Sequence, residues 1–129
     1  MTPELMTLKK KTIDGMVSYM KYGAADGEND PEYDPSFKAD YTQKNIDQCE
    51  AILDGMLADL ASPRIQSQAA MIRQAVQRAV VKLNKLNEVC EGGLIETGQR
   101  ENLRELIIAA AKHAGLTVEG DITEEWREW

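Results

Sequence analysis

A regular apolar stripe over residues 65–90 constrains the fold more than any other feature of this sequence. Its apolar residues recur alternately four and three positions apart: Ile65, Ala69, Ile72, Val76, Ala79, Leu83, Leu86 and Cys90. This spacing places their side chains along one side of a long α-helix. A stripe of this length has to be buried against other helices, and the chain supplies three more amphipathic segments of suitable length.

The composition predicts an all-α fold. The chain has 129 residues, of which 43% are hydrophobic, but only two Trp, four Tyr and one Phe. The core must therefore consist mainly of Leu, Ile, Val, Met and Ala, and these residues, with the abundant Gln, Glu and Lys, favour helix. Runs of β-branched residues long enough for a strand are missing. We predict one domain over residues 1–129, large enough to bury a substantial core.

Prolines indicate where helices begin, because proline is well tolerated at the first helical position after a capping Ser, Thr or Asp. Three such pairs open long helical patterns: Thr2-Pro3, Asp34-Pro35 and Ser62-Pro63. The short connection at residues 61–63 makes the flanking helices antiparallel neighbours. We therefore predict a four-helix bundle with a short C-terminal helix, the helices covering residues 3–22, 35–61, 63–90, 98–114 and 122–128.

The net charge of −7 argues against nucleic acid as a partner, because neutralisation of phosphates by Lys and Arg supplies most of that affinity. It also disfavours anionic membranes, and it permits a basic protein partner. Cys49 and Cys90 fall on apolar helix faces, where free cysteine behaves as a small hydrophobe. With no signal-peptide pattern and no transmembrane run, we expect a cytoplasmic protein.

An acidic segment over residues 23–34 has the alternating carboxylates of an EF-hand calcium loop. Pro31 stands where that loop needs Gly for its sharp turn, and Phe37 stands where the bidentate Glu belongs. Weak calcium association, a solvated connection and an acidic surface for a basic partner remain open. We predict no metal site, and we name the loop's candidate partner-binding residues as Asp26, Glu28, Asp30, Glu32, Tyr33, Asp34 and Tyr41.

The C-terminal tail holds both tryptophans of the chain. Asp121-Ile122-Thr123-Glu124 has the form of a capping box that opens a short helix. In that helix Trp126 and Trp129 would share one face with Ile122. They either staple the tail onto the bundle or form an exposed anchor for a partner, since Trp is enriched at interface hot spots. Both are therefore candidate partner-binding residues.

Known catalytic motifs are missing from the sequence. It holds no Walker loop, dinucleotide-binding glycine motif, zinc-ligand cluster or nucleophile elbow. His113 is the only histidine, and its place in a last helical turn is typical of a C-terminal capping residue. We predict no catalytic residue, no cofactor and no enzymatic activity. An enzyme using paired carboxylates remains the alternative, because 22 acidic residues allow some pair to meet in space.

Two segments, LIETGQRE at residues 94–101 and DITEEWREW at residues 121–129, resemble small uncharacterised bacterial all-helical proteins. The resemblance covers roughly the last third of the chain and implies no activity or functional residue. In size and acidity the chain is also similar to bacterial immunity proteins, which bind toxins through acidic surfaces. We therefore predict a non-catalytic, immunity-like binding or neutralising module. The alternative is a structural homo-oligomer that uses Met71, Val80 and Val81 or the two tryptophans.

Overall fold

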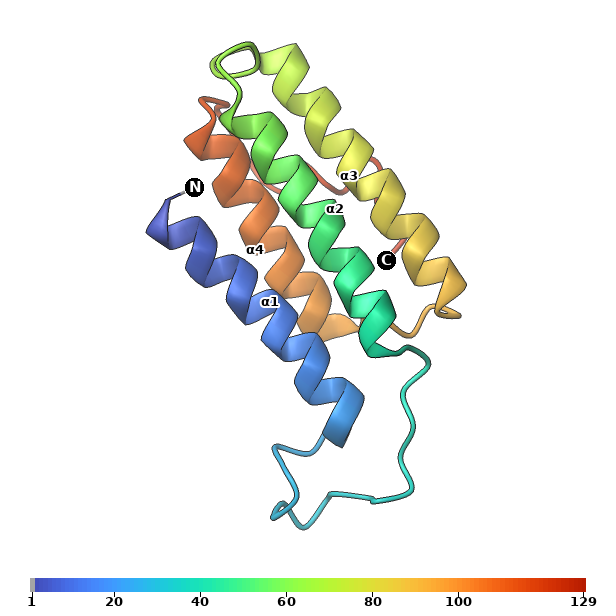
Figure 1. Cartoon of the computed structure of the whole chain (residues 1–129). Helices are drawn as coiled ribbons and strands as arrows, with labels where there is room; N and C mark the ends of the chain where they lie inside the picture. The colour runs from blue at the N-terminus through green and yellow to red at the C-terminus, as the bar shows by residue number, and fades with distance from the viewer. Residues whose placement is uncertain (1) are drawn as a thin grey trace.

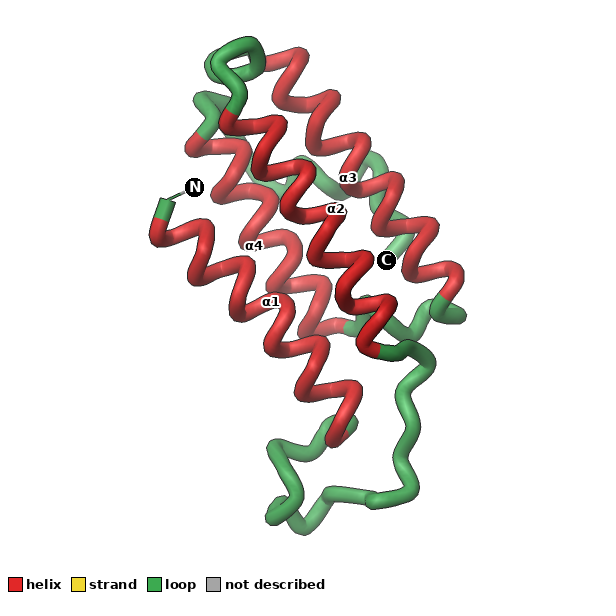
Figure 2. Tube along the Cα trace, in the orientation of Figure 1, coloured by secondary structure: helices red, strands yellow, loops and turns green. Residues whose placement is uncertain are grey.

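The computed structural model describes residues 2–129 and is an up-down-up-down bundle of four α-helices (Figure 1). Loops and turns make up the rest, and no strand occurs within these residues (Figure 2). The all-α fold and the four-helix bundle are confirmed. The helices are α1 (Pro3–Tyr22), α2 (Gln43–Ala61), α3 (Ala69–Val89) and α4 (Thr97–His113).

The bundle is built from two extensive helix pairs, α1 with α4 and α2 with α3. Smaller contacts join α1 to α2, α3 to α4, and α2 to α4 across the core. The stripe of α3 is buried as its spacing predicts, with Ile72, Val76 and Leu83 fully buried, whereas Ala69 at the start of the helix is exposed. None of the helices within residues 2–129 is both long and apolar enough to cross a membrane.

Helix ends with strong local signals lie where the sequence predicts. The Thr2 hydroxyl accepts a hydrogen bond from the Leu5 amide at 3.2 Å and caps α1. Gly23, with φ of +63°, ends this helix and donates its amide to the Tyr19 carbonyl at 2.8 Å. After α4 the amide of Leu116 donates to the Ala111 carbonyl at 3.1 Å, and Gly115 donates to Lys112, which completes a Schellman motif.

The predicted start of α2 at residue 35 is wrong, because the helix begins at Gln43. Asp34 caps only a turn, in which its carboxylate accepts from the Ser36 amide at 2.9 Å. The chain then remains without regular secondary structure until the Thr42 amide donates to the Asn45 carboxamide oxygen at 2.9 Å and the helix opens.

The predicted start of α3 at residue 63 is also wrong, because Pro63 opens a turn and the helix begins at Ala69. Ser67 has a left-handed φ of +63°, and its amide donates to the Ala114 carbonyl at the end of α4, 2.8 Å away. This long-range bond pulls the chain out of the helical path, since a left-handed residue cannot continue a right-handed helix.

The tail, residues 115–129, contains a turn where a helix over 122–128 was predicted. The Arg127 amide donates to the Thr123 carbonyl at 2.8 Å, but no further turn follows. Asp121 does not form the predicted capping box; its carboxylate accepts from the Thr123 amide at 2.9 Å in a tight turn. The tail runs along the seam between α3 and α4, because it is bonded to Asn84 of α3 and to Arg104 of α4 (Figure 1).

Candidate partner-binding surface

The acidic loop, defined here as residues 23–42, joins α1 to α2 at one end of the bundle and contains no helix (Figure 2). It carries six carboxylates and a single basic residue, Lys38, which gives a formal charge of −5 out of −7 for the whole chain. Most of the net charge is therefore concentrated in this one connection. Its carboxylates belong to Asp26, Glu28, Asp30, Glu32, Asp34 and Asp40.

Aromatic packing fastens the acidic loop to the last turns of α1. Phe37 meets Tyr19 edge-on, with ring centroids 5.6 Å apart, and Tyr33 meets Tyr22 in the same way at 5.8 Å. Tyr41 stacks on Tyr19 at 6.5 Å. All four tyrosines and the only phenylalanine of the chain take part in this cluster. The loop therefore has a defined path despite its length.

Tyr41 is an anchor of the loop and is not available to a partner. Its side chain is 4% exposed, and its hydroxyl donates to the Met16 carbonyl of α1 at 2.8 Å. Burial raises the pKa of Tyr41 well above its usual value, so the hydroxyl stays protonated. The prediction that Tyr41 binds a partner is therefore wrong. Tyr33, by contrast, is half-buried.

Two loop carboxylates shape the loop itself. Asp30 accepts hydrogen bonds from the amides of Asp26 and Glu32, each at 2.9 Å, and these bonds lower its pKa. Asp34 accepts from the hydroxyl and the amide of Ser36, which lower its pKa in the same way. The carboxylates of Asp26, Glu28 and Glu32 make no hydrogen bond within residues 2–129, and all three residues are exposed.

The carboxylates of the acidic loop are not neutralised by ion pairs within the described chain. Helix α1 carries three consecutive lysines, and each is paired elsewhere: Lys9 with Glu50 and Asp54, Lys10 with Asp14, and Lys11 with Glu105. In residues 2–129 no carboxylate of the acidic loop takes part in an ion pair. This end of the bundle therefore presents an open negative field, which raises the encounter rate with cations and basic surfaces.

The two tryptophans lie apart from the acidic loop, against the bundle. Trp126 and Trp129 are both half-buried and pack on the core. Asn84 of α3 holds this part of the tail, because its side-chain amide donates to the Trp126 carbonyl at 2.8 Å and its oxygen accepts from the Glu128 amide at 3.0 Å. No hydrogen bond or ion pair of the described chain joins the tail to the loop.

The ring of Trp129 is packed against the core, but its polar atom lacks a hydrogen-bond partner within the described chain. The Arg127 guanidinium lies over its ring, 5.8 Å from the centroid. Its indole nitrogen is buried, and in the part of the chain that the structure describes it has no hydrogen-bond partner. Both tryptophans thus hold the tail on the bundle, and neither presents a fully exposed ring to a partner.

The sequence did not predict a charge cluster with a buried carboxylate that connects the tail to α4. The Asp121 carboxylate, 5% exposed, accepts from the guanidinium groups of Arg104 at 2.8 Å and Arg127 at 3.1 Å. Burial alone would raise the pKa of Asp121, but the hydrogen bonds from Thr123 and Arg127 and the charge of Arg104 together lower it. Arg104 lies 17 residues away in the sequence, so no local pattern reveals this partnership.

Comparisons with family models, with curated proteins and with solved structures found no match for this chain. Among residues 2–129 no group of three or more His, Cys, Asp or Glu side chains is placed to hold a metal ion.

One shallow hollow of about 390 Å³ is lined by three acids, Glu88, Glu91 and Glu128. A hollow of this kind keeps carboxylate chemistry open as an alternative function.

Proposed function

We propose that this protein is a non-catalytic binding module that docks a basic protein through its acidic loop. The observation that carries the proposal is a connection of 20 residues that bears a formal −5 charge and yet follows a fixed path. Connections longer than about 12–15 residues without secondary structure are uncommon in compact domains and usually have a function.

Pre-ordering of the acidic loop supports this function in a second way. Association has to overcome the entropy of ordering flexible segments, and a loop that is already ordered avoids much of that loss. Here the rings of Tyr33, Phe37 and Tyr41 and the turns at Asp30 and Asp34 fix the backbone. The carboxylates of Asp26, Glu28 and Glu32 make no hydrogen bond within residues 2–129, and these three residues are exposed to a partner.

The partner is a basic protein, and its neutralisation in the manner of an immunity protein is the form of this function that we favour. The concentrated charge would steer a basic surface toward this end of the bundle. We place the interaction in the bacterial cytoplasm. Buried, unpaired Cys49 and Cys90 are in keeping with such a reducing compartment.

The alternative of a structural homo-oligomer receives less support. The apolar face proposed for it from Met71, Val80 and Val81 does not form, because Val80 is fully buried and Met71 is half-buried. The large apolar side chains with substantial exposure are Val81, Val89 and Met6, which belong to α3 and α1. Helices α1 and α3 are not a packed pair, so these side chains do not make one patch.

The test removes the three carboxylates that do not shape the loop, in a variant with Asp26→Asn, Glu28→Gln and Glu32→Gln. Wild-type protein is immobilised, a lysate of the source bacterium is passed over it, and bound proteins are quantified at 50 and 300 mM salt. We expect a basic protein that is retained at low salt and reduced at high salt, because exposed charge pairs are screened. The triple variant is expected to retain about tenfold less, since exposed pairs contribute about 0.2–1 kcal/mol each.

A matched control distinguishes the loop from net charge. It neutralises three exposed carboxylates outside the loop and changes the charge of the chain by the same amount: Glu91→Gln, Glu119→Gln and Glu124→Gln. The control is expected to retain the basic protein like the wild type. Equal capture by the triple variant, equal loss in the control, or no captured basic protein at either salt concentration would refute the proposal.

A further inference from the structure

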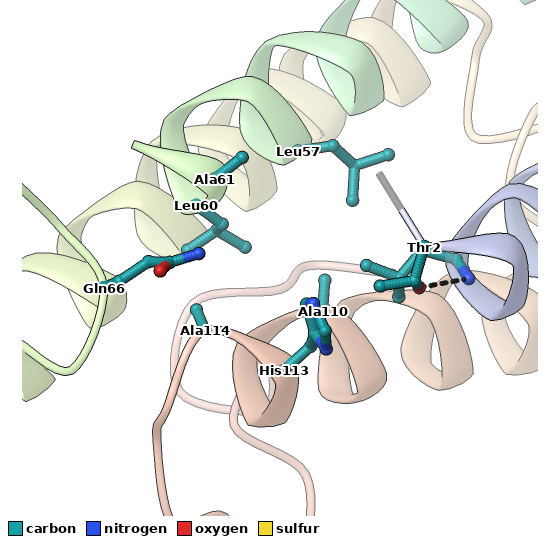
Figure 3. A pocket seen from close by; sticks show the side chains of 9 residues that line it. Thr2, Leu57, Leu60, Ala61, Gln66, Ala110, His113 and Ala114 are labelled. Carbon is teal, nitrogen blue, oxygen red and sulfur yellow. Dashed lines mark hydrogen bonds between the residues drawn. The ribbon is translucent and has the colours of Figure 1, made fainter. Parts of the chain in front are cut away.

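A cavity of about 260 Å³ lies at the end of the bundle opposite the acidic loop, where α1 begins and α2 and α4 end (Figures 1 and 3). Its walls come from all three of these helices. Three leucines form the larger surfaces, and three alanines leave the space open by being small. The apolar lining residues are Leu5, Leu57, Leu60, Ala61, Ala110 and Ala114.

Five of the six apolar lining residues belong to the packed core, and the exposed Ala61 lies at the rim of the cavity. Leu5 and Leu57 are each 5% exposed, Leu60 is 4% exposed, and Ala110 and Ala114 are 1% and 3% exposed. Ala110 of α4 and Ala114, which follows its last residue, both face this hollow. An apolar cavity of this kind binds apolar molecules, since filling it restores contacts that its lining atoms lack.

Two polar side chains at the cavity have no partner in the described chain. Gln66 reaches in from the connection between α2 and α3, and His113 from the last turn of α4 (Figure 3). Neither side chain makes a hydrogen bond or an ion pair within residues 2–129, and both residues are exposed. By contrast the third polar lining group, the Thr2 hydroxyl, already accepts a hydrogen bond from the Leu5 amide. A ligand in the cavity would thus meet one carboxamide and one imidazole.

Size and shape restrict the ligand. A cavity of about 150 Å³ binds benzene, so about 260 Å³ corresponds to roughly ten heavy atoms. On α2 the lining residues span only 57–61, and at the end of α4 they span only 110–114. At a rise of about 1.5 Å per residue each stretch is about 6 Å long. Along the helix axes an extended alkyl chain of ten carbons exceeds this length, whereas a fused aromatic ring system fits within it.

We propose that this cavity is a binding site for a compact bicyclic aromatic molecule that carries one hydroxyl group. The rings lie against Leu57, Leu60 and Ala110. The hydroxyl donates to an imidazole nitrogen of His113 and accepts from the carboxamide of Gln66. The site is independent of the acidic loop, which lies at the other end of the bundle, so binding of a basic protein and binding of this ligand are separate properties (Figure 1).

The test is a titration of the ¹⁵N-labelled full chain with 2-naphthol at pH 8, followed by amide chemical shifts. We expect saturable changes concentrated at residues 57–61 and 110–114, with a Kd of about 0.1–1 mM for a ligand of this size. Naphthalene, which lacks the hydroxyl, is expected to bind at the same place about threefold to tenfold more weakly, as for the loss of one or two neutral hydrogen bonds. Changes that do not saturate, or that map elsewhere, would overturn the proposal.

Two variants and one control make the test specific. Ala61→Leu fills the rim of the cavity and is expected to weaken both ligands by at least about tenfold. Ala58→Leu makes the same change one turn earlier on α2, at an exposed position outside the lining, and is expected to bind like the wild type. Gln66→Met is expected to weaken 2-naphthol alone. Unchanged binding in Ala61→Leu, or an equal loss in Ala58→Leu, would refute the site.

Discussion

Replacing Asp121 with asparagine is expected to destabilise the fold by about 2 kcal/mol. The Asp121 carboxylate accepts one hydrogen bond from Arg104 of α4 and one from Arg127 of the tail, and an asparagine cannot provide that charge. Hydrogen bonds to charged groups contribute about 1.5–3 kcal/mol each. The two arginine side chains are 31% and 21% exposed, so water can replace part of the hydrogen bonding that they lose in the variant. We therefore expect the total loss of stability to be about 2 kcal/mol.

Thermal unfolding at pH 7 is the assay for this prediction. With an unfolding entropy of about 2.1 cal/mol/K per residue, a loss of about 2 kcal/mol in a chain of 129 residues lowers Tm by about 7 °C. Glu124→Gln is the matched control, because this exposed tail carboxylate makes no ion pair within residues 2–129. Its Tm is expected to change little. A shift in Asp121→Asn no larger than that of the control would refute the view that this carboxylate holds the tail.

The same variant has a defined pH dependence. The folded-state pKa of Asp121 is lowered from its usual 3.8, so its contribution is fully present above about pH 4 and is lost as the pH falls through the lowered value. The stability gap between wild type and Asp121→Asn is therefore expected to be constant from pH 7 to about pH 5 and to close in stronger acid. A gap that keeps its full size in strong acid would contradict the assignment of the stabilisation to the ionised carboxylate.

Three further predictions follow from burial and backbone geometry. Gly55→Ala is expected to raise the free energy of unfolding in urea by about 0.5–1 kcal/mol, because this helical glycine has open space around it. Cys49 and Cys90 are expected to react with a thiol reagent at pH 8 only after unfolding, since both are buried and burial raises the pKa of Cys49 to about 12. Tyr41→Phe is expected to lower stability by about 1 kcal/mol through loss of the bond to Met16, measured by the same urea titration.

Local signals predicted the ends of α1 and α4 well, because capping residues and glycine act within one turn. They failed at the start of α2 and α3. An Asp-Pro or Ser-Pro pair opens a turn as readily as a helix, and contacts from outside the segment decide between them. The Tyr41 hydroxyl donates to the Met16 carbonyl of α1, and the Ser67 amide donates to the Ala114 carbonyl at the end of α4. Neither partner is visible from the sequence around the proline.

The candidate surface was predictable in part for the same reason. The acidic loop was recognisable because five of its carboxylates are close in sequence, and those of Asp26, Glu28 and Glu32 are exposed as expected. The roles of Tyr41 and of the tryptophans depend on distant helices and were not predictable. Asn84 likewise binds the distant tail, and Asn87 accepts a hydrogen bond from the Ile95 amide at 2.9 Å.

The uneven distribution of aromatic residues supplies two built-in optical reporters. Every tyrosine belongs to the cluster that fastens the acidic loop, and both tryptophans lie in the tail over α3 and α4. Excitation at wavelengths absorbed only by indole therefore follows undocking of the tail, while near-ultraviolet dichroism of the phenol rings follows the loop. Loosening at the two places can be watched separately in one unlabelled sample.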